Sequence, residues 1–215
     1  MADENGQQKE DCWSVFKGYY GSSEDSDITL YLGRKKVPFP AHRLILKARS
    51  PYFREVEKDQ GGKYDIYMER EPRIGGLKLM LQYIYTGDYS FDVRTANVQE
   101  EFEPDVDSLN IHAIVCSTAI DYDVKGLEDL CVKKFKKSIV TNWNVQSFCR
   151  CAEMVFHYAC FFNCMALRPV IVDTAISHAE ELRERPEFIH VIDRSHDFAE
   201  DLAKRFLWEH SVGIL

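Results

Sequence analysis

Residues 40–53 read PAHRLILKARSPYF, and within this segment the chain changes from extended to helical character. Three apolar residues fall at i, i+1 and i+4, the spacing of one helical face: Leu44, Ile45 and Ala48. Ser50 and Pro51 then provide an N-cap residue and a first-position proline for a second short helix. The segment therefore predicts two short helices that meet at Arg49.

Short extended segments lie on both sides of this helical pair. Residues 27–32 alternate β-branched and aromatic side chains and end at Gly33, which predicts a strand followed by a hairpin turn. Residues 34–39 predict a return strand that prolines confine to a sheet edge or a terminus. Residues 64–69 alternate again and predict a third strand.

Helical spacing dominates the rest of the chain. Residues 77–84 mark one face of a helix that is expected to stop at Thr86 and Gly87. The acid-rich residues 92–107 are expected to form a surface insertion. Amphipathic helices are predicted over residues 111–122 and 127–139. Three further helical segments are predicted after them, at residues 143–160, 167–183 and 197–209.

The order of these elements predicts an α+β fold, in which a small β-sheet is covered by a cluster of α-helices. A C-terminal helical extension follows this domain. We expect residues 1–25 to be a flexible acidic N-terminal tail, residues 26–140 to be the main domain and residues 141–215 to be the extension.

Composition narrows the classes of function. The chain has 215 residues, of which 45% are hydrophobic and 29% charged, as expected for a soluble globular protein. Its net charge of -8 argues against a protein that neutralises phosphates, so neither nucleic acid nor a membrane surface is an expected partner. The most apolar stretch, residues 154–167, is shorter than the roughly 20 residues that cross a bilayer.

Cysteine usage points to reduced thiols. The chain has 7 cysteines, an odd number, and its polar beginning does not resemble a secretory signal, which favours an intracellular protein of the cytoplasm or nucleus. One group is a candidate for zinc because several members share a helical face: Cys149, His157, Cys160 and Cys164. No CxxC pair supports such a site, so neither a metal nor another cofactor is predicted.

No catalytic residue can be named from the sequence. The chain lacks GxSxG, HExxH, a Walker loop and the glycine fingerprint of dinucleotide-binding proteins. His178, His190 and His196 have no nucleophile placed near them by a motif. The lysines of residues 133–137 are expected to form a solvated helix face that does not bind DNA. We therefore predict that the protein is not an enzyme.

Three blocks of the sequence resemble the BTB/POZ domain family, in the order in which that family carries them. The first joins SDI at residues 26–28 to the segment 40–53, the second is MLQYIYTGDY at 80–89, and the third is AIDYDVKGL at 119–127. The chain is similar to the short stand-alone BTB proteins common in fungi. One departure lies in the third block, where Ile120 and Asp121 replace the family's usual acidic-then-basic pair.

The resemblance implies a dimer interface. Family members that form homodimers keep an aspartate in the first strand and an arginine in the first helix near that interface, and Asp27 and Arg43 occupy the matching positions. A carboxylate and a guanidinium that pair in a partly buried site are held in one orientation, and removing either partner is costly, so such a pair can select a specific interface. The same pair could equally form an ion pair or a helix cap inside one domain.

The resemblance also implies contacts with a cullin. Cullin-binding members often carry a hydrophobic-any-glutamate triplet before the fourth helix, and the triplet from Val98 to Glu100 fits that pattern. So short a motif also arises by chance. Tyr122, in the third block, is a further candidate contact, and the helix after Trp143 is a counterpart of the extension that helps to hold a cullin.

The expected function is therefore that of a protein-protein interaction module. It would pair with itself or with another BTB protein and recruit an unidentified target protein to a cullin-3-type ubiquitin ligase. No kelch, MATH or zinc-finger segment is recognised in the chain. An oligomerisation scaffold or a transcription-associated regulator without a cullin is the alternative, and an enzyme with an unrecognised site is a more distant one.

Overall fold

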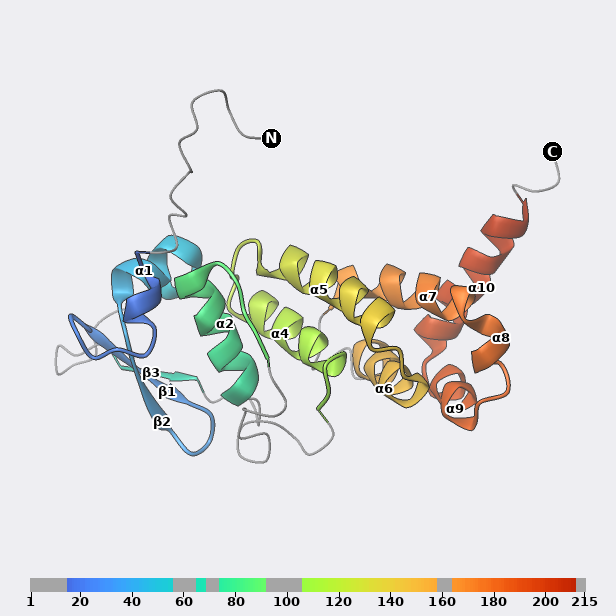
Figure 1. Ribbon diagram of the computed structural model, residues 1–215, viewed down its shortest axis with the longest axis horizontal. Coiled ribbons are helices and arrows are strands. Elements are labelled where there is room, and N and C mark those ends of the chain that lie inside the picture. The colour runs from blue at the N-terminus through green and yellow to red at the C-terminus, as the bar shows by residue number, and fades with distance from the viewer. Residues whose placement is uncertain (1–14, 56–64, 69–73, 92–105, 158–163, 212–215) are drawn as a thin grey trace, which may run out of the picture. The chain divides into compact units, whose positions relative to one another are not determined.

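The computed structural model describes residues 15–55, 65–68, 74–91, 106–157 and 164–211 (Figure 1). The chain divides into two compact units, residues 1–90 and residues 91–215. The first unit contains the β-sheet, and the described elements of the second unit are all helices. The α+β fold class is confirmed.

The first unit is built around a small mixed sheet, which Figure 1 shows beside helices α1 and α2. Its elements are η1 (Lys17–Tyr19), β1 (Ile28–Leu32), β2 (Val37–Ala41), α1 (Arg43–Arg49), η2 (Tyr52–Arg54), β3 (Asp65–Met68) and α2 (Ile74–Thr86). Its strand order is β2-β1-β3, with β1 antiparallel to β2 and parallel to β3. Strand β2 lies at the edge, as expected for a segment with two prolines, because proline has no N–H for a further strand.

The two faces of the sheet differ in exposure, because side chains alternate across a strand. One face is buried and contributes to the core of this unit with Leu30, Leu32, Phe39, Ala41, Ile66 and Met68. The opposite face carries Thr29, Tyr31, Pro38, Pro40, Asp65 and Tyr67. The core on the first face also includes most of α2, whose side chains are buried along nearly its whole length.

The turn between β1 and β2 depends on Gly33. Its φ of 64° lies in the left-handed region that favours glycine. A Cβ atom at this position would lie 2.5 Å from Cγ1 of Ile74, at the start of α2. Both the turn and the close approach of α2 therefore require a residue without a side chain.

The second unit is a helical assembly, whose helices Figure 1 labels α4 to α10. Its elements are α4 (Asn110–Asp121), α5 (Leu127–Thr141), α6 (Val145–Phe156), η3 (Met165–Leu167), α7 (Arg168–Ser177), α8 (Ala179–Leu182), α9 (Pro186–Arg194) and α10 (His196–Ser211). Phe198 of α10 is fully buried. Its ring centroid lies 4.9 Å from that of Phe156 in α6 and 6.0 Å from that of Phe188 in α9. An aromatic cluster thus joins three helices of this unit.

The C-terminal helices differ in detail from the sequence prediction. The helix expected over residues 167–183 is interrupted at His178, which separates α7 from α8 with φ of -112° and ψ of 19°. Helix α9 was not predicted at all, although Pro186 occupies a favoured first helical position. The four apolar residues from Phe188 to Ile192 follow helical spacing, and two of them, Phe188 and Val191, are buried, so the sequence does contain a local signal for this helix.

Candidate interaction surface

A buried polar network fixes the start of α1. The backbone N–H of His42 donates to the hydroxyl of Tyr85 at 2.9 Å, and Nδ1 of His42 lies 3.0 Å from the same hydroxyl. Nε2 of His42 lies 2.8 Å from the carbonyl oxygen of Glu24. A carbonyl can only accept, so Nε2 carries the ring proton and Nδ1 accepts the proton of the Tyr85 hydroxyl. Every polar atom in this network therefore has a partner.

Burial changes the chemistry of the tyrosine in this network. Tyr85 is 0% exposed, and its burial raises the pKa of its hydroxyl to about 12. The hydroxyl therefore keeps its proton at neutral pH and remains a donor to His42. The network is a structural element that fixes the start of α1.

Asp27 acts directly on the first turn of α1. Its Oδ1 accepts a hydrogen bond from the backbone N–H of Arg43 at 2.8 Å. That N–H has no acceptor within the helix, and a carboxylate near a helix N-terminus is also favoured by the helix dipole. Asp27 therefore caps the N-terminus of α1, and a helix cap inside one domain was one of the alternatives to the interface role. Its role at a dimer interface stays a prediction.

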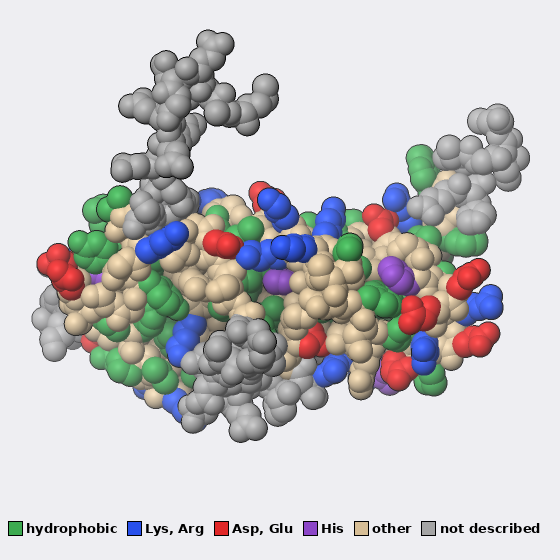
Figure 2. All heavy atoms as spheres, viewed as in Figure 1, with side chains coloured by type: hydrophobic (Ala, Val, Ile, Leu, Met, Phe, Trp, Pro, Cys, Tyr) green, Lys and Arg blue, Asp and Glu red, His purple; other side chains and the backbone are tan. Residues whose placement is uncertain are grey.

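The first residues of α1 also present an apolar side chain to solvent. Leu44 is 80% exposed. Just before η1, Val15 is 67% and Phe16 is 38% exposed. The ring of Tyr19 in η1 lies 5.1 Å from that of His42, so η1 lies beside the start of α1. We call Val15, Phe16 and Leu44 the α1 face. Figure 2 shows hydrophobic side chains at the surface over this part of the unit.

The residues expected to contact a cullin are either outside the described residues or buried. Val98 and Glu100 lie outside the described residues. Tyr122 follows α4 as its C-cap residue and is only 4% exposed. Its backbone N–H donates to the carbonyl of Thr118 at 3.1 Å. Its side chain therefore offers little surface to a partner.

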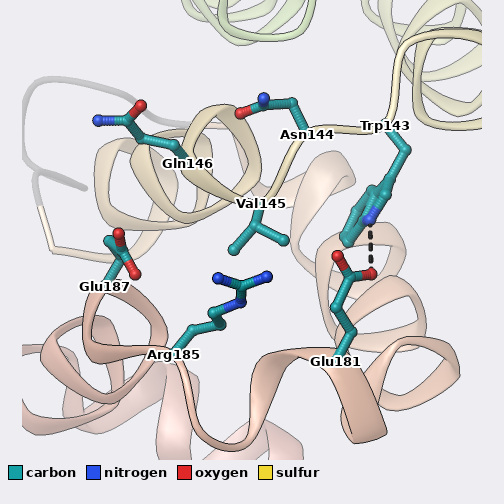
Figure 3. A pocket seen from close by; sticks show the side chains of 7 residues that line it. All are labelled: Trp143, Asn144, Val145, Gln146, Glu181, Arg185 and Glu187. Carbon is teal, nitrogen blue, oxygen red and sulfur yellow. Dashed lines mark hydrogen bonds between the residues drawn. The ribbon is translucent and has the colours of Figure 1, made fainter.

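A polar pocket of about 340 Å³ lies in the second unit, between the start of α6 and the turn from α8 to α9 (Figure 3). The indole Nε1 of Trp143 donates to Oε2 of Glu181 at 2.9 Å, and the indole ring stacks on His178 with 3.9 Å between ring centroids. The side chain of Arg185 extends into the pocket between Glu181 and Glu187. The lining residues include no serine, cysteine or histidine, so the pocket has no nucleophile–base pair of the kind found in serine or cysteine hydrolases.

The candidate zinc ligands do not converge in the part of the chain that the structure describes. Within those residues, no group of three or more histidine, cysteine or acidic side chains could hold a metal ion. Cys164 donates to the carbonyl of Ala113 at 3.2 Å, and Nδ1 of His157 donates to the carbonyl of Arg194 at 3.1 Å. Cys160 lies outside the described residues. Burial raises the pKa of the Cys149 thiol to about 12, which makes that thiol unreactive.

The lysines of α5 lie on a helix surface, as expected. Lys133, Lys136 and Lys137 are exposed, whereas Phe135 between them is fully buried. Figure 2 shows Lys and Arg side chains gathered at the surface over α5. Among the described residues, no helix combines the length and the apolar character that a membrane crossing requires.

The first unit combines a small mixed β-sheet with helices, and α1 presents the exposed side chain of Leu44. The family model of the BTB/POZ domain matches residues 16–139. The chain belongs to the BTB/POZ domain family. Domains of this family are protein-interaction and oligomerisation modules that are generally non-catalytic.

Individual relatives match only part of this chain. Kelch-like protein 41 of Homo sapiens is 41% identical over 80 residues, which is 35% of this chain and 12% of that protein. Kelch-like protein 41a of Danio rerio is 25% identical over 170 residues, which is 76% of this chain and 24% of that protein. The matched region is therefore a minor part of each relative's length.

Proposed function

We propose that this protein pairs with itself or with another BTB protein through the α1 face, and that it serves as an adaptor between a target protein and a cullin-3-type ubiquitin ligase. The first part of the proposal rests on Leu44, whose side chain is 80% exposed. Leu44 lies on a helix whose start is fixed by two hydrogen bonds, one to Tyr85 and one to Asp27. The second part rests on the resemblance to cullin-binding family members.

Burial of the α1 face would favour pairing. Burying one leucine side chain contributes roughly 1.5–3 kcal/mol, and a two-fold symmetric interface buries each such residue twice. The rigid start of α1 reduces the ordering cost of association, because its backbone is already held by Asp27 and Tyr85. Arg43 is adjacent to Leu44 in the sequence, so its charge would lie close to the apolar contact.

The cap on α1 can be separated from the proposed interface role of Asp27. Asparagine at position 27 keeps an oxygen that can accept the Arg43 N–H but removes the negative charge. Alanine removes both and is expected to cost about 1 kcal/mol in the free energy of unfolding. A dimer weakened by Asp27→Asn with Arg43→Gln, at unchanged thermal stability, would assign the charges to the interface.

The oligomeric state is measured by light scattering on the purified chain. We expect a dimer for the wild type and a monomer for Leu44→Asp. The matched control is Val140→Asp, because Val140 is 83% exposed at the end of α5 and receives the same new charge. A wild-type monomer, or equal dimerisation of both variants, would exclude the α1 face as the pairing surface.

The adaptor role is tested with an N-terminal fragment of cullin-3. Titration into the wild-type protein is expected to give a complex, and Val98→Ala with Glu100→Ala is expected to weaken it. A complex that is unchanged by this double substitution would exclude the triplet as the contact. A dimer that does not bind the fragment would instead favour the oligomerisation scaffold or transcription-associated regulator.

A further inference from the structure

The outer face of the β-sheet carries a stacked pair of tyrosines. Tyr31 of β1 and Tyr67 of β3 are register partners, and their ring centroids lie 4.8 Å apart with 11° between the ring planes. Tyr67 is 52% exposed. Both rings stand on paired strands, so the backbone fixes their positions before any partner arrives.

The two tyrosine hydroxyls are available for hydrogen bonds. Within the described part of the chain, neither hydroxyl has a hydrogen-bond partner. The nearby carboxylate of Asp65 raises the pKa of Tyr31, so its hydroxyl remains a proton donor. Two adjacent donors therefore stand on the exposed side of the sheet.

The turn from β1 to β2 adds positive charge beside this ring pair. Arg34, Lys35 and Lys36 follow one another in this turn, and all three are exposed. The ammonium of Lys36 lies 5.0 Å from the ring centroid of Tyr67, which places a cation directly beside the rings. Among the described residues, Arg34 and Lys35 form no ion pair. This cationic cluster stands out in a chain of net charge -8.

We propose that these five residues, Tyr31, Arg34, Lys35, Lys36 and Tyr67, form a docking surface for an extended acidic segment of a partner protein. The hydroxyls, the ammonium groups and the guanidinium can all donate hydrogen bonds, and carboxylates are the complementary acceptors. Tyrosine and arginine are also the side chains that most often dominate the energy of protein interfaces.

The sheet also determines how such a segment would lie. Two prolines in β2 remove N–H groups from that strand, so this edge is poorly suited to pairing with an added strand, and the segment would lie across the face instead. Asp65 is paired with Thr29, at the end of the ladder opposite the basic turn. Its negative charge would repel acidic residues there, so the acidic part of the segment is expected at the turn.

Nucleic acid is a less suitable occupant of the same surface. Bases stack on exposed aromatic rings of β-sheets, but such sites combine the rings with a basic groove that follows several phosphates. Among the described residues beside the ring pair, the cations lie in one turn, and the chain as a whole is acidic. A short run of carboxylates on a partner protein could be bound by this local cluster alone.

The proposal is tested by fluorescence anisotropy with a labelled peptide of alternating glutamate and proline, about 12 residues long, in which proline maintains an extended backbone. The comparison probes are the lysine-proline peptide of equal length and a labelled oligothymidylate of about 12 nucleotides. We expect the acidic peptide to bind the wild type, and its binding to weaken as salt is added. Equal binding of the lysine-proline peptide, tighter binding of the oligonucleotide, or no binding of the acidic peptide would overturn the proposal.

Two variants locate the binding. Tyr31→Ser with Tyr67→Ser, and separately Arg34→Glu with Lys35→Glu, are each expected to weaken binding by about tenfold or more. Lys136→Glu with Lys137→Glu makes the same charge change on α5 and is expected to leave binding within about twofold. Equal losses in the two charge-reversal variants would overturn the proposal, because they would reflect only net charge. Leu44→Asp is expected to keep peptide binding, so failure of this surface is distinguishable from failure of the α1 face.

Discussion

The hydroxyl of Tyr85 joins α1 to α2, because it lies 2.9 Å from the backbone nitrogen of His42 and 3.0 Å from Nδ1 of the same residue. Both residues are buried. A single side chain therefore satisfies a buried backbone donor and a buried ring nitrogen. Its loss has consequences for stability that can be measured.

The variant Tyr85→Phe should be less stable than the wild type at pH 7. The substitution keeps the ring but leaves the buried N–H of His42 without an acceptor, which costs about 1–3 kcal/mol in the free energy of unfolding. Urea denaturation measures this difference. Tyr20→Phe is the control, because it removes a half-buried hydrogen bond to the carbonyl of Lys78 and should cost less. A larger loss in the control than in Tyr85→Phe would contradict the role of this network.

The contribution of Tyr85 should also depend on alkaline pH. Burial raises the pKa of Tyr85 to about 12, whereas an unfolded tyrosine has a pKa of about 10. Between these values the unfolded chain releases the proton and the folded chain keeps it, so rising pH favours unfolding. The stability advantage of the wild type over Tyr85→Phe should therefore be complete below pH 10 and decrease as the pH approaches 12. An advantage that is constant over this range would refute the burial of an ionisable hydroxyl.

His112 should produce the corresponding effect in acid. Its side chain is 8% exposed, and its burial, together with the charge of Lys134, lowers its pKa to about 4. The unfolded chain binds the proton near pH 6.5, so stability is full above that value and falls as the pH decreases toward 4, by a total on the order of 3 kcal/mol. We expect wild type to lose this stability relative to His112→Gln in urea titrations. His196→Gln, which removes an exposed histidine, serves as the control.

Gly33→Ala should destabilise the first unit by about 2–4 kcal/mol, because it combines left-handed backbone strain with an overlap against Ile74. Gly18→Ala is the matched control, since a Cβ atom at position 18 meets no atom within 4 Å. Combining Gly33→Ala with Ile74→Ala should cost less than the sum of the two single changes, because the overlap is relieved. Thermal unfolding of the four variants measures this coupling. Strict additivity would show that the overlap with Ile74 does not contribute.

Much of the fold could be predicted from local patterns. The strand before Gly33, the edge position of β2 and the helix that ends at Thr86 follow from alternation, proline chemistry and a terminal glycine. Helix α9 carries a local signal of the same kind, because Pro186 and the helical spacing of the apolar residues from Phe188 to Ile192 favour a helix. Its packing is different, because the contact of Phe188 with Phe198 from another helix is not a local property.

The candidate interaction residues show a similar division. Asp27 and Arg43 were identified from the family resemblance, but the atoms that join them, a carboxylate oxygen and a backbone N–H, are apparent only in the structure. The partner of Tyr85 was not predicted, although a buried tyrosine hydroxyl generally requires a hydrogen-bond partner. The boundary between residues 140 and 141 stays a prediction, as do the contacts of Val98 and Glu100.

By itself, the sequence determined the order and type of most elements and the membership of the BTB/POZ family, because hydrophobic period, proline and glycine act over a few neighbouring residues. Only the tertiary structure decided which side chains meet. Tyr31 and Tyr67 become neighbours because β1 and β3 pair in parallel across an intervening strand and helix, and His42 meets Tyr85 across 43 positions. Such contacts depend on how distant segments pack. The free energy of that packing has contributions from the whole unit, so it cannot be predicted from a local sequence pattern.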